Sequence, residues 1–285
     1  MKLSKTLIAG LASALCLTAG TAAVAAGGAA HPKDVDFSFE GPFGTFDQAQ
    51  LQRGFRVYKE VCASCHSISL LSFRDLGIKG GPFWSERWPN PNDNLYVKAI
   101  AAEYEVDDID TESGDTIKRK AVPADRFPSP YANAIAAAAS NGGAAPPDLS
   151  VMAKARHGGA DYIYSLMMGY VRPPAGLKVN PGQYYNVYFP GDLTSSWSGD
   201  KHHVPKGGFI AMPAPLTSDG QVTYDDGTTA TVDQMSRDVA AFIAWATEPK
   251  QTERKQTGLA VMLYLALFSV LTFLSYKKLW KNVGH

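Results

Sequence analysis

The stretch Cys62-Ala63-Ser64-Cys65-His66 limits what this chain can fold into more than any other. Cys-x-x-Cys-His is the attachment signature of a c-type haem. The two thiols bond to the porphyrin and the adjoining histidine ligates the iron. A chain with this motif builds its core around a porphyrin. We therefore predict one haem c, attached covalently through Cys62 and Cys65, with His66 as an axial ligand.

Three other roles for the cysteine pair compete with haem attachment. A thioredoxin-type dithiol needs a strand-to-helix turn, which the flanking residues do not predict. A zinc site needs a second pair of ligands, but the remaining histidines are scattered. A plain disulfide is the third alternative. The adjoining His66 favours haem over all three. The third cysteine, Cys16, lies in a segment that we expect to be removed.

The charge of the chain is unevenly distributed. Its formal net charge is zero, but residues 31–250 carry 20 Lys and Arg against 26 Asp and Glu. The compensating cations lie at the two ends of the chain. This acidic balance argues against nucleic acid as a partner and favours a basic protein partner for the main domain.

The first 26 residues have the organisation of a secretory signal peptide. Lys2 and Lys5 precede an apolar stretch at residues 7–17, and small residues at 23–25 suit cleavage between residues 23 and 30. The segment has no Arg, unlike a mitochondrial presequence. Its apolar stretch is short for the alternative, an N-terminal membrane anchor. We predict residues 1–26 to be a signal peptide.

The other end of the chain predicts a membrane anchor. Residues 257–276 contain no charged side chain. At about 1.5 Å per residue, a helix of this length spans about 30 Å, the hydrocarbon thickness of a bilayer. Lys277, Lys278, Trp280 and Lys281 follow it, as at a cytoplasmic membrane face. We predict an exported haem domain at 27–255, a transmembrane helix at 256–277 and a cytoplasmic tail at 278–285.

Two capping patterns predict the helices that frame the domain. Thr45 is the expected N-cap of a helix that leads into the haem motif, and Thr231 of a late helix with one apolar face. Gly54 is costly inside a helix unless another element approaches closely. We expect the two helices to cross at Gly54, as the terminal helices of a class I cytochrome c do.

The region between the two helices is rich in loops. Residues 148–170 predict a helix that breaks at Gly158 and Gly159. An Asp-Gly turn within residues 224–228 predicts a small β-hairpin. The expected fold class is mainly α: a class I cytochrome c-like haem domain with long loops and a small hairpin, plus one C-terminal transmembrane helix.

The second axial ligand of the iron decides between electron transfer and chemistry at an open iron site. Met212 lies between Ala211 and Pro213, in a loop that the prolines stiffen, far along the chain from His66. The other methionines fall on expected helices. His202 or His203 is the rival ligand, although both lie in a Ser-, Gly- and Lys-rich stretch that is typical of a surface loop. We predict His66 and Met212 as the metal ligands.

Several stretches resemble the cytochrome c1 family, the haem subunits of cytochrome bc1 complexes. The resemblance rests on residues 53–66, on Pro-Pro-Asp-Leu-Ser at 146–150, on Ala-Arg-His-Gly-Gly-Ala-Asp-Tyr at 155–162, and on Tyr-Phe-Pro-Gly at 188–191. The Asp-Asp-Gly-Thr turn and the C-terminal anchor match as well. The similarity runs from about residue 36 to the end. One departure is a longer segment at 192–209 than in mitochondrial members.

The resemblance implies roles for further residues. Met212 matches the family's methionine ligand, Arg156 an arginine that meets a haem propionate, and Tyr162 a tyrosine nearby. Other positions match residues that line the haem: Asn141, Pro147, Leu166, Met167 and Phe189.

The resemblance also implies a place in an electron-transfer chain. A Rieske iron–sulfur protein would pass single electrons to this haem, and the haem would pass them to a basic soluble cytochrome c (c2-like). Cytochrome b and membrane lipid would surround the anchor. The expected location is the bacterial inner membrane, with the haem domain in the periplasm and a cytoplasmic C-terminus. The chain would be a subunit of ubiquinol–cytochrome c oxidoreductase without independent catalysis.

An acidic run at residues 103–115 is a further candidate for partner docking. It holds seven acids and no base: Glu103, Glu105, Asp107, Asp108, Asp110, Glu112 and Asp115. Such a run is either a solvated loop or a surface that steers a basic partner. Two other classes of protein stay open, a membrane-tethered monohaem shuttle and a haem enzyme of peroxidase type with an open sixth position.

Overall fold

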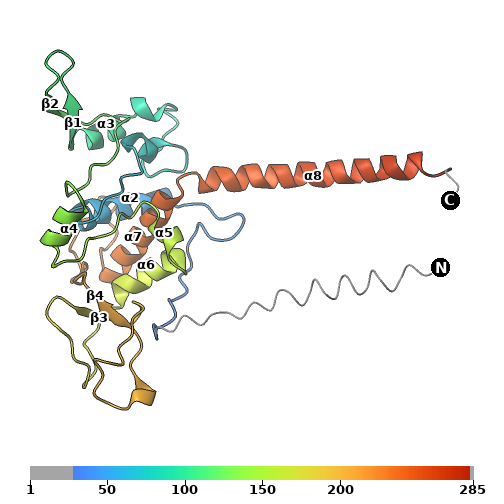
Figure 1. The fold of residues 1–285 in the computed structure, drawn as a ribbon. Coiled ribbons are helices and arrows are strands. Elements are labelled where there is room, and N and C mark those ends of the chain that lie inside the picture. Colours follow the sequence, from blue (N-terminus) through green and yellow to red (C-terminus); the bar gives the residue numbers. More distant parts are fainter. Residues whose placement is uncertain (1–27, 283–285) are drawn as a thin grey trace, which may run out of the picture.

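The computed structural model describes residues 28–282, so the predicted signal peptide lies outside the described residues. The described chain is mainly helical, with two small two-stranded sheets. Figure 1 shows a domain from which one long helix, α8, projects. The expected mainly α fold with one apolar C-terminal helix is confirmed. Its assignment to class I stays a prediction.

A crossing pair of helices forms the centre of the domain. Helix α2 (Gln48–Val57) packs against α7 (Val232–Thr247), as predicted. A Cβ added to Gly54 would lie 2.0 Å from the carbonyl oxygen of Asp238 and 2.6 Å from the Cβ of Phe242. Only glycine permits so close an approach. The crossing at Gly54 is confirmed.

One of the two predicted helix caps is confirmed and the other is wrong. Thr231 caps α7, since its side chain accepts from the backbone N–H of Gln234 at 3.1 Å. Thr45 as the cap of α2 is wrong. Asp47 takes that role and accepts from the N–H of Gln50 at 2.7 Å. A carboxylate two residues further on satisfies the free N–H groups, so the helix begins later.

The predicted helix at 148–170 breaks where expected. It consists of α5 (Met152–Ala155) and α6 (Gly159–Met168). Gly158 lies between them with a φ of +89°, a left-handed conformation that favours glycine. Both helices pack against α7. The remaining helices are short: 3₁₀ turns at Phe73–Gly77, Pro91–Asp93 and Lys201–His203, and α-helices α3 (Leu95–Ala101) and α4 (Ala134–Ser140).

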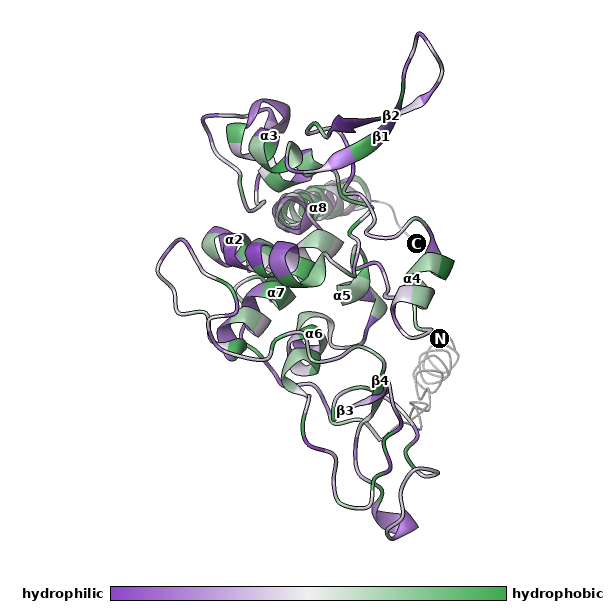
Figure 2. Cartoon of the chain, turned by 90° about the vertical axis from the view of Figure 1, so that its left-hand side faces the viewer, coloured by the Kyte–Doolittle hydropathy of each residue, from purple (hydrophilic) through white to green (hydrophobic). Residues whose placement is uncertain are grey.

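The two sheets are hairpin-like and antiparallel. Strand β1 (Glu105–Ile109) pairs with β2 (Thr116–Lys120), and β3 (Tyr184–Asn186) pairs with β4 (Gly208–Ile210). The first protrudes from one end of the domain, and Figure 2 shows β2 as strongly hydrophilic. The second belongs to a lobe with its own small core of Leu177, Tyr185 and Leu193. The segment 192–209 lies in this lobe.

The hairpin predicted at residues 224–228 is wrong, because the Asp-Gly sequence makes a turn without strands. The carboxylate of Asp226 accepts from the N–H of Thr228 at 3.0 Å. Asp226 also pairs with Arg53, and Asp225 with Arg56, each at 2.7 Å. These ion pairs attach the turn to α2, so its flanks have no strand partner.

Helix α8 (Gln251–Leu279) follows α7 after three residues. Its 29 residues have a mean hydropathy of 2.1 over their most apolar window, and none of that window is buried. Helix α8 thus has the length, composition and exposure of a single membrane anchor.

Candidate haem site

The Cys-x-x-Cys-His motif forms one compact turn at the end of α2. The helix widens into a π-helical turn (Tyr58–Cys62), in which the N–H of Ala63 bonds to the carbonyl of Tyr58 at 2.8 Å. The N–H groups of Cys65 and His66 then both bond to the carbonyl of Cys62, at 3.1 and 2.8 Å. These bonds hold the residues that carry both thiols and the imidazole together in one short turn.

Both cysteines of this turn are free thiols, so the disulfide alternative is not formed. Burial, with a contribution from Cys65, raises the pKa of the Cys62 thiol to about 12. A redox dithiol needs the opposite, a lowered pKa. Within residues 28–282 no group of three or more His, Cys, Asp or Glu side chains could hold a metal ion. The raised pKa therefore argues against the redox-dithiol alternative.

His66 is held by one ring nitrogen. Its Nδ1 lies 2.7 Å from the carbonyl oxygen of Pro147. Since a carbonyl only accepts, Nδ1 carries the proton and Nε2 keeps its lone pair for a metal. Burial lowers the pKa of His66, against the opposing effects of the Pro147 bond and the charge of Asp148. The ring is thus kept neutral, as a metal ligand must be.

Asp148 joins the segment after His66 to the segment of Pro147. One carboxylate oxygen accepts from the hydroxyls of Ser67 and Ser69, at 2.6 and 2.7 Å, and from the N–H of Ser69 at 2.9 Å. The other oxygen accepts from the N–H of Ser150 at 2.7 Å. Burial would raise the pKa of Asp148, but these hydrogen bonds outweigh it and lower the pKa to about 2. Asp148 thereby fixes the distance between His66 and Pro147.

Arg156 and Tyr162 lie on either side of the break between α5 and α6. Arg156 is exposed and its guanidinium donates to the carbonyl of Ala155 at 3.1 Å. Tyr162 is buried on α6. Burial raises the pKa of Tyr162, against the opposing charge and hydrogen bond of Arg156. The structure therefore brings these two predicted residues together, with the Arg156 guanidinium at the surface.

Met212 lies in the loop after β4 and is half-buried. The hydroxyl of Tyr170 donates to the Met212 carbonyl at 3.1 Å. Tyr170 itself lies just after α6 and bridges to Asn186 of β3. Burial raises the pKa of Tyr170, so its hydroxyl keeps the proton that it donates. The Met212 loop is thus attached to the end of α6.

The remaining predicted haem contacts are spread over four segments. Leu166 and Met167 are half-buried on α6, and Phe189 is half-buried after β3. Asn141 ends α4, where its amide donates to Tyr131 and to the carbonyl of Ala137 at 3.0 and 2.7 Å. Pro147 is exposed and in direct contact with His66. Of these residues only Pro147 has a hydrogen bond to the Cys-x-x-Cys-His turn.

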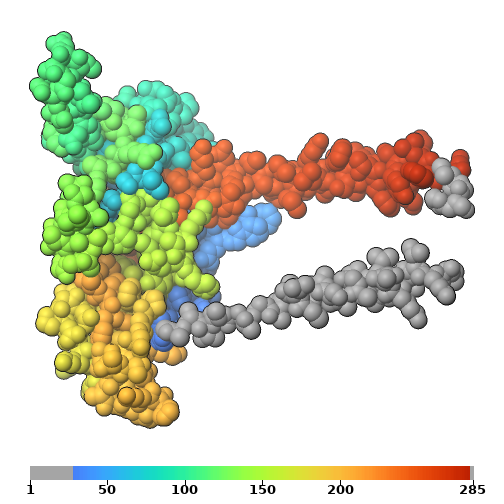
Figure 3. Space-filling view, in the orientation of Figure 1, coloured from blue at the N-terminus to red at the C-terminus, as the bar shows by residue number. Residues whose placement is uncertain are grey.

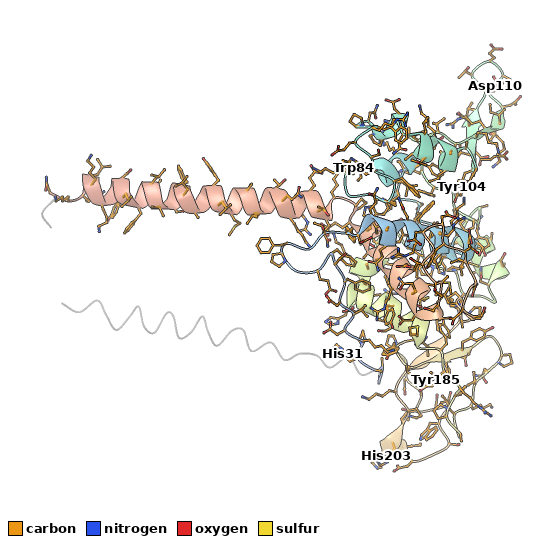
Figure 4. All side chains as sticks on the ribbon, turned by 180° about the vertical axis from the view of Figure 1, so that it is seen from behind. His31, Trp84, Tyr104, Asp110, Tyr185 and His203 are labelled. Atoms are coloured by element: carbon orange, nitrogen blue, oxygen red, sulfur yellow. The ribbon has the colours of Figure 1, made fainter. Side chains whose placement is uncertain are left out.

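The rival ligands His202 and His203 have surface positions. Both belong to the 3₁₀ turn Lys201–His203. The side chain of His203 is 81% exposed and its Nδ1 lies 2.7 Å from Asp200. Figure 4 shows His203 at the far tip of the β3–β4 lobe. These positions fit an exposed histidine pair.

Two residues of the site have roles that were not predicted. Asp148 and Tyr170 touch neither thiol, but they hold the His66–Pro147 contact and the Met212 loop. The sequence signal for Asp148 is its place in the Pro-Pro-Asp-Leu-Ser stretch at 146–150. Nothing in the sequence around Tyr170 points to a bond 42 positions away.

The donor set fits a covalently bound haem. Two free thiols, a histidine with Nε2 available and a methionine in a braced loop are the groups that c-type attachment and Met/His ligation use. These residues lie on a domain that ends in one membrane-length apolar helix. Together they define a membrane-associated protein of the c-type haem class.

The chain belongs to the cytochrome C1 family, whose family model matches residues 37–283. The resemblance noted in the motifs is confirmed. Proteins of this family bind haem c and take part in electron transfer within the bc1 complex, an oxidoreductase. A role as a subunit without independent catalysis is consistent with that membership.

Several relatives are similar over most of the chain. Cytochrome c1 of Rhodospirillum rubrum is 41% identical over 96% of this chain and 97% of its own length. The mitochondrial cytochrome c1 haem protein of Saccharomyces cerevisiae is 41% identical over 89% of this chain and 73% of its own length. Cytochrome b/c1 of Bradyrhizobium diazoefficiens is 42% identical over 90% of this chain, which spans 36% of that longer protein.

Proposed function

We propose that this chain is the haem-bearing electron-transfer subunit of a bacterial ubiquinol–cytochrome c reductase. It takes single electrons from a Rieske iron–sulfur protein and passes them to a basic soluble cytochrome c (c2-like). The observation that carries this proposal is His66, fixed through Nδ1 on Pro147 beside two free thiols. Family membership supplies the context.

Each residue of the proposed site has a structural task. Haem c, bound through Cys62 and Cys65, supplies a reversible one-electron iron couple. His66 and Met212 would ligate its iron. Pro147 fixes the imidazole and Tyr170 fixes the backbone of Met212. Since the protein braces both residues, the site would change little between its redox states, which suits rapid electron transfer.

Further residues would contact the haem periphery. Arg156, exposed beside Tyr162, is placed to pair with a propionate, because a partly buried carboxylate needs a charged donor. The other proposed contacts are Asn141, Pro147, Leu166, Met167 and Phe189.

The proposed orientation in the membrane follows from the two ends of the domain. Helix α8 anchors the chain in the bacterial inner membrane, with Lys277 and Lys278 on the cytoplasmic side and the haem domain in the periplasm. Cytochrome b and lipid would surround the anchor. The predicted domain boundaries at residues 27, 256 and 278 stay part of this proposal.

Replacing the proposed sixth ligand tests the mechanism. Met212→Leu should lower the midpoint potential of the haem by a sizeable part of the roughly 0.8 V range that axial ligation spans. It should also abolish reduction of cytochrome c. Met235→Leu is the matched control, because Met235 is a fully buried residue of α7 and Leu conserves its volume. An unchanged potential in Met212→Leu would remove Met212 from the site.

Co-purification separates the proposal from its alternatives. The intact chain, extracted in mild detergent, should carry cytochrome b and the Rieske protein. A chain that is redox-active without either of them would be a membrane-tethered shuttle. A ferric haem that binds small ligands such as cyanide readily would indicate the open iron of a peroxidase-type enzyme.

A further inference from the structure

Two loops outside the haem site flank the point at which α8 leaves the domain. One comprises residues 40–44 and the other residues 80–84. Figure 1 shows the first as a blue loop that extends beside the start of α8, in the direction in which α8 leaves. We call these two loops the collar.

The first collar loop presents one aromatic side chain outward. Phe43, at its tip, is 75% exposed. The neighbouring aromatics point inward instead: Phe37 and Phe39 are buried, and the ring of Phe39 lies 4.5 Å from that of Phe46. Gly41, with a φ of +65°, makes the turn that leads to the tip. The loop therefore has a rigid aromatic base and an apolar tip.

Lys255 fixes this loop to the first turns of α8. Its ammonium group donates to the carbonyls of Phe39 and Gly44, at 2.6 and 3.1 Å. Lys255 precedes the uncharged run of α8 by two residues, which is about 3 Å along a helix. The base of the loop is thus held at the level where the apolar surface of α8 begins.

The second collar loop lies against the same part of α8. A Cβ added to Gly80 would lie 3.7 Å from the hydroxyl of Thr252. Figure 4 shows Trp84 close to the domain end of α8. The side chain of Gln48 donates to the carbonyl of Trp84 at 2.8 Å, which ties this loop to α2. Trp84 is half-buried.

We infer that the collar is a second membrane contact, in which Phe43 inserts into the headgroup region of the lipid bilayer and Trp84 lies at the same interface. The apolar ring of Phe43 gains by leaving water at the boundary between headgroups and acyl chains. The indole of Trp84 combines an apolar body with a polar N–H, which suits the same interface. Lys255 puts a cation at the same level, where lipid phosphates lie, whereas Arg254 beside it is paired with Glu248. The inference rests on α8 as the anchor and not on the route of the electron.

Continuity with α8 favours lipid over a protein partner. The exposed apolar surface of α8 begins directly past the collar, where Leu259 is 45% and Met262 67% exposed. In Figure 3 the blue loop lies alongside that start of α8. A bilayer that surrounds α8 at this level also meets Phe43. Two contacts beside the anchor would fix the tilt and rotation of the haem domain above the membrane.

A depth-sensitive probe tests the inference in the intact complex. Phe43→Cys is labelled with an environment-sensitive fluorophore, since haem attachment consumes Cys62 and Cys65. The unsubstituted chain measures background labelling. The complex is placed in vesicles of phosphatidylcholine and phosphatidylglycerol that carry a nitroxide either on the headgroup or deep on an acyl chain. The probe should be quenched more by the headgroup nitroxide, and its emission should shift to shorter wavelength.

Two matched variants define the outcomes. Ile135→Cys is the negative control, because Ile135 is 83% exposed on α4, away from the side on which α8 leaves. Leu265→Cys, in α8, should be quenched by the acyl-chain nitroxide. If the probe at residue 43 behaves like the probe at residue 135 while the probe at residue 265 is quenched, the collar inference is wrong and α8 remains the anchor. It would show that a protein partner or water covers Phe43. If 265 is not quenched either, the anchor and the collar both fail.

Discussion

Asp148 shows how much of this site depends on one residue that touches no proposed ligand. Its carboxylate accepts four hydrogen bonds, from Ser67, Ser69 and Ser150. Three of these come from the chain directly after His66. The carboxylate thus aligns two segments about 80 positions apart, and the His66–Pro147 bond forms between them.

Asp148→Asn should destabilise the domain at neutral pH. The pKa of Asp148 falls from its ordinary 3.8 to about 2. Discounted for partial solvent exposure, this corresponds to about 1–2 kcal/mol of the free energy of unfolding. Because the folded-state pKa is the lower one, this stabilisation is complete above about pH 4 and is lost as the pH falls towards 2. Denaturant unfolding at pH 7 and at pH 3 should show a difference between wild type and variant that shrinks at the lower pH.

Asp225→Asn provides the control for this prediction. The side chain of Asp225 is 87% exposed and pairs with Arg56 at the surface. Exposed pairs contribute about 0–1 kcal/mol, so this variant should stay close to wild type at both pH values. If both variants lose the same free energy of unfolding, the hydrogen bonds of Asp148 stabilise the fold no more than an exposed ion pair does.

Residue-level prediction has its firmest basis where chemistry requires neighbours in sequence. The sequence predicts roles for Cys62, Cys65 and His66 because attachment of one porphyrin needs all three within five positions. Met212 was predicted from its stiff loop and from resemblance. Tyr170 could not be predicted, because its bond to the Met212 loop exists only once β3 has placed the end of α6.

Among the elements, the α2–α7 crossing is the central packing contact of the domain. Gly54 has no side chain that would hold the helices apart. The ring centroid of Phe242 lies 5.6 Å from that of Phe55 and 5.5 Å from that of Tyr58. The haem motif follows α2 directly. Any shift of α2 against α7 therefore moves both thiols.

Gly54→Ala should separate α2 from α7. The new Cβ would lie 2.0 Å from the carbonyl oxygen of Asp238, a distance that the backbone must relieve. Overpacking of this kind costs about 1–3 kcal/mol, and here the clash is with backbone. The thermal unfolding midpoint of the haem domain should fall. Gly258→Ala is the control, since a Cβ at Gly258 meets nothing within 4 Å. A midpoint that stays at the wild-type value in Gly54→Ala would mean that the helices are not in this close contact.

Helices were predicted better than hairpins for a physical reason. Capping residues and apolar spacing act within a few positions, so α7 and the break at Gly158 could be predicted from the sequence. A hairpin also needs something to pair with. The Asp-Gly turn at 226–227 bonds to α2, while the acidic run became β1 because Lys118 and Lys120 of β2 lie opposite Asp107 and Glu105.

At the scale of the whole molecule, the acidic run is a projecting hairpin with mixed charge. Ion pairs join several of its acids to cations: Asp107 to Lys118, Asp108 to Arg119, Glu105 to Lys120 and Glu103 to Lys59. Seven acids still face three bases within residues 103–120. The tip, with Asp110, Glu112 and Asp115, carries the excess negative charge.

Neutralising the tip tests whether the hairpin steers a basic partner. The triple variant Asp110→Asn, Glu112→Gln, Asp115→Asn should slow reduction of a basic cytochrome c at low ionic strength, by about 10-fold at most. Its rate should also depend less on salt. The control neutralises three exposed acids elsewhere, Asp36, Glu86 and Glu253. Salt dependence that is the same in both variants would make the hairpin a solvated protrusion.

The crossing of α2 and α7 also sets the order of events when the chain is made. Arg53 and Asp238, which bond across it, are 185 positions apart. At about 5–20 residues per second, roughly 10–40 s pass between the synthesis of α2 and that of its partner. The helix pair cannot close before then, and such long-range contacts form slowly. Throughout this interval Cys62 and Cys65 lie on a chain whose central helix pair is still open.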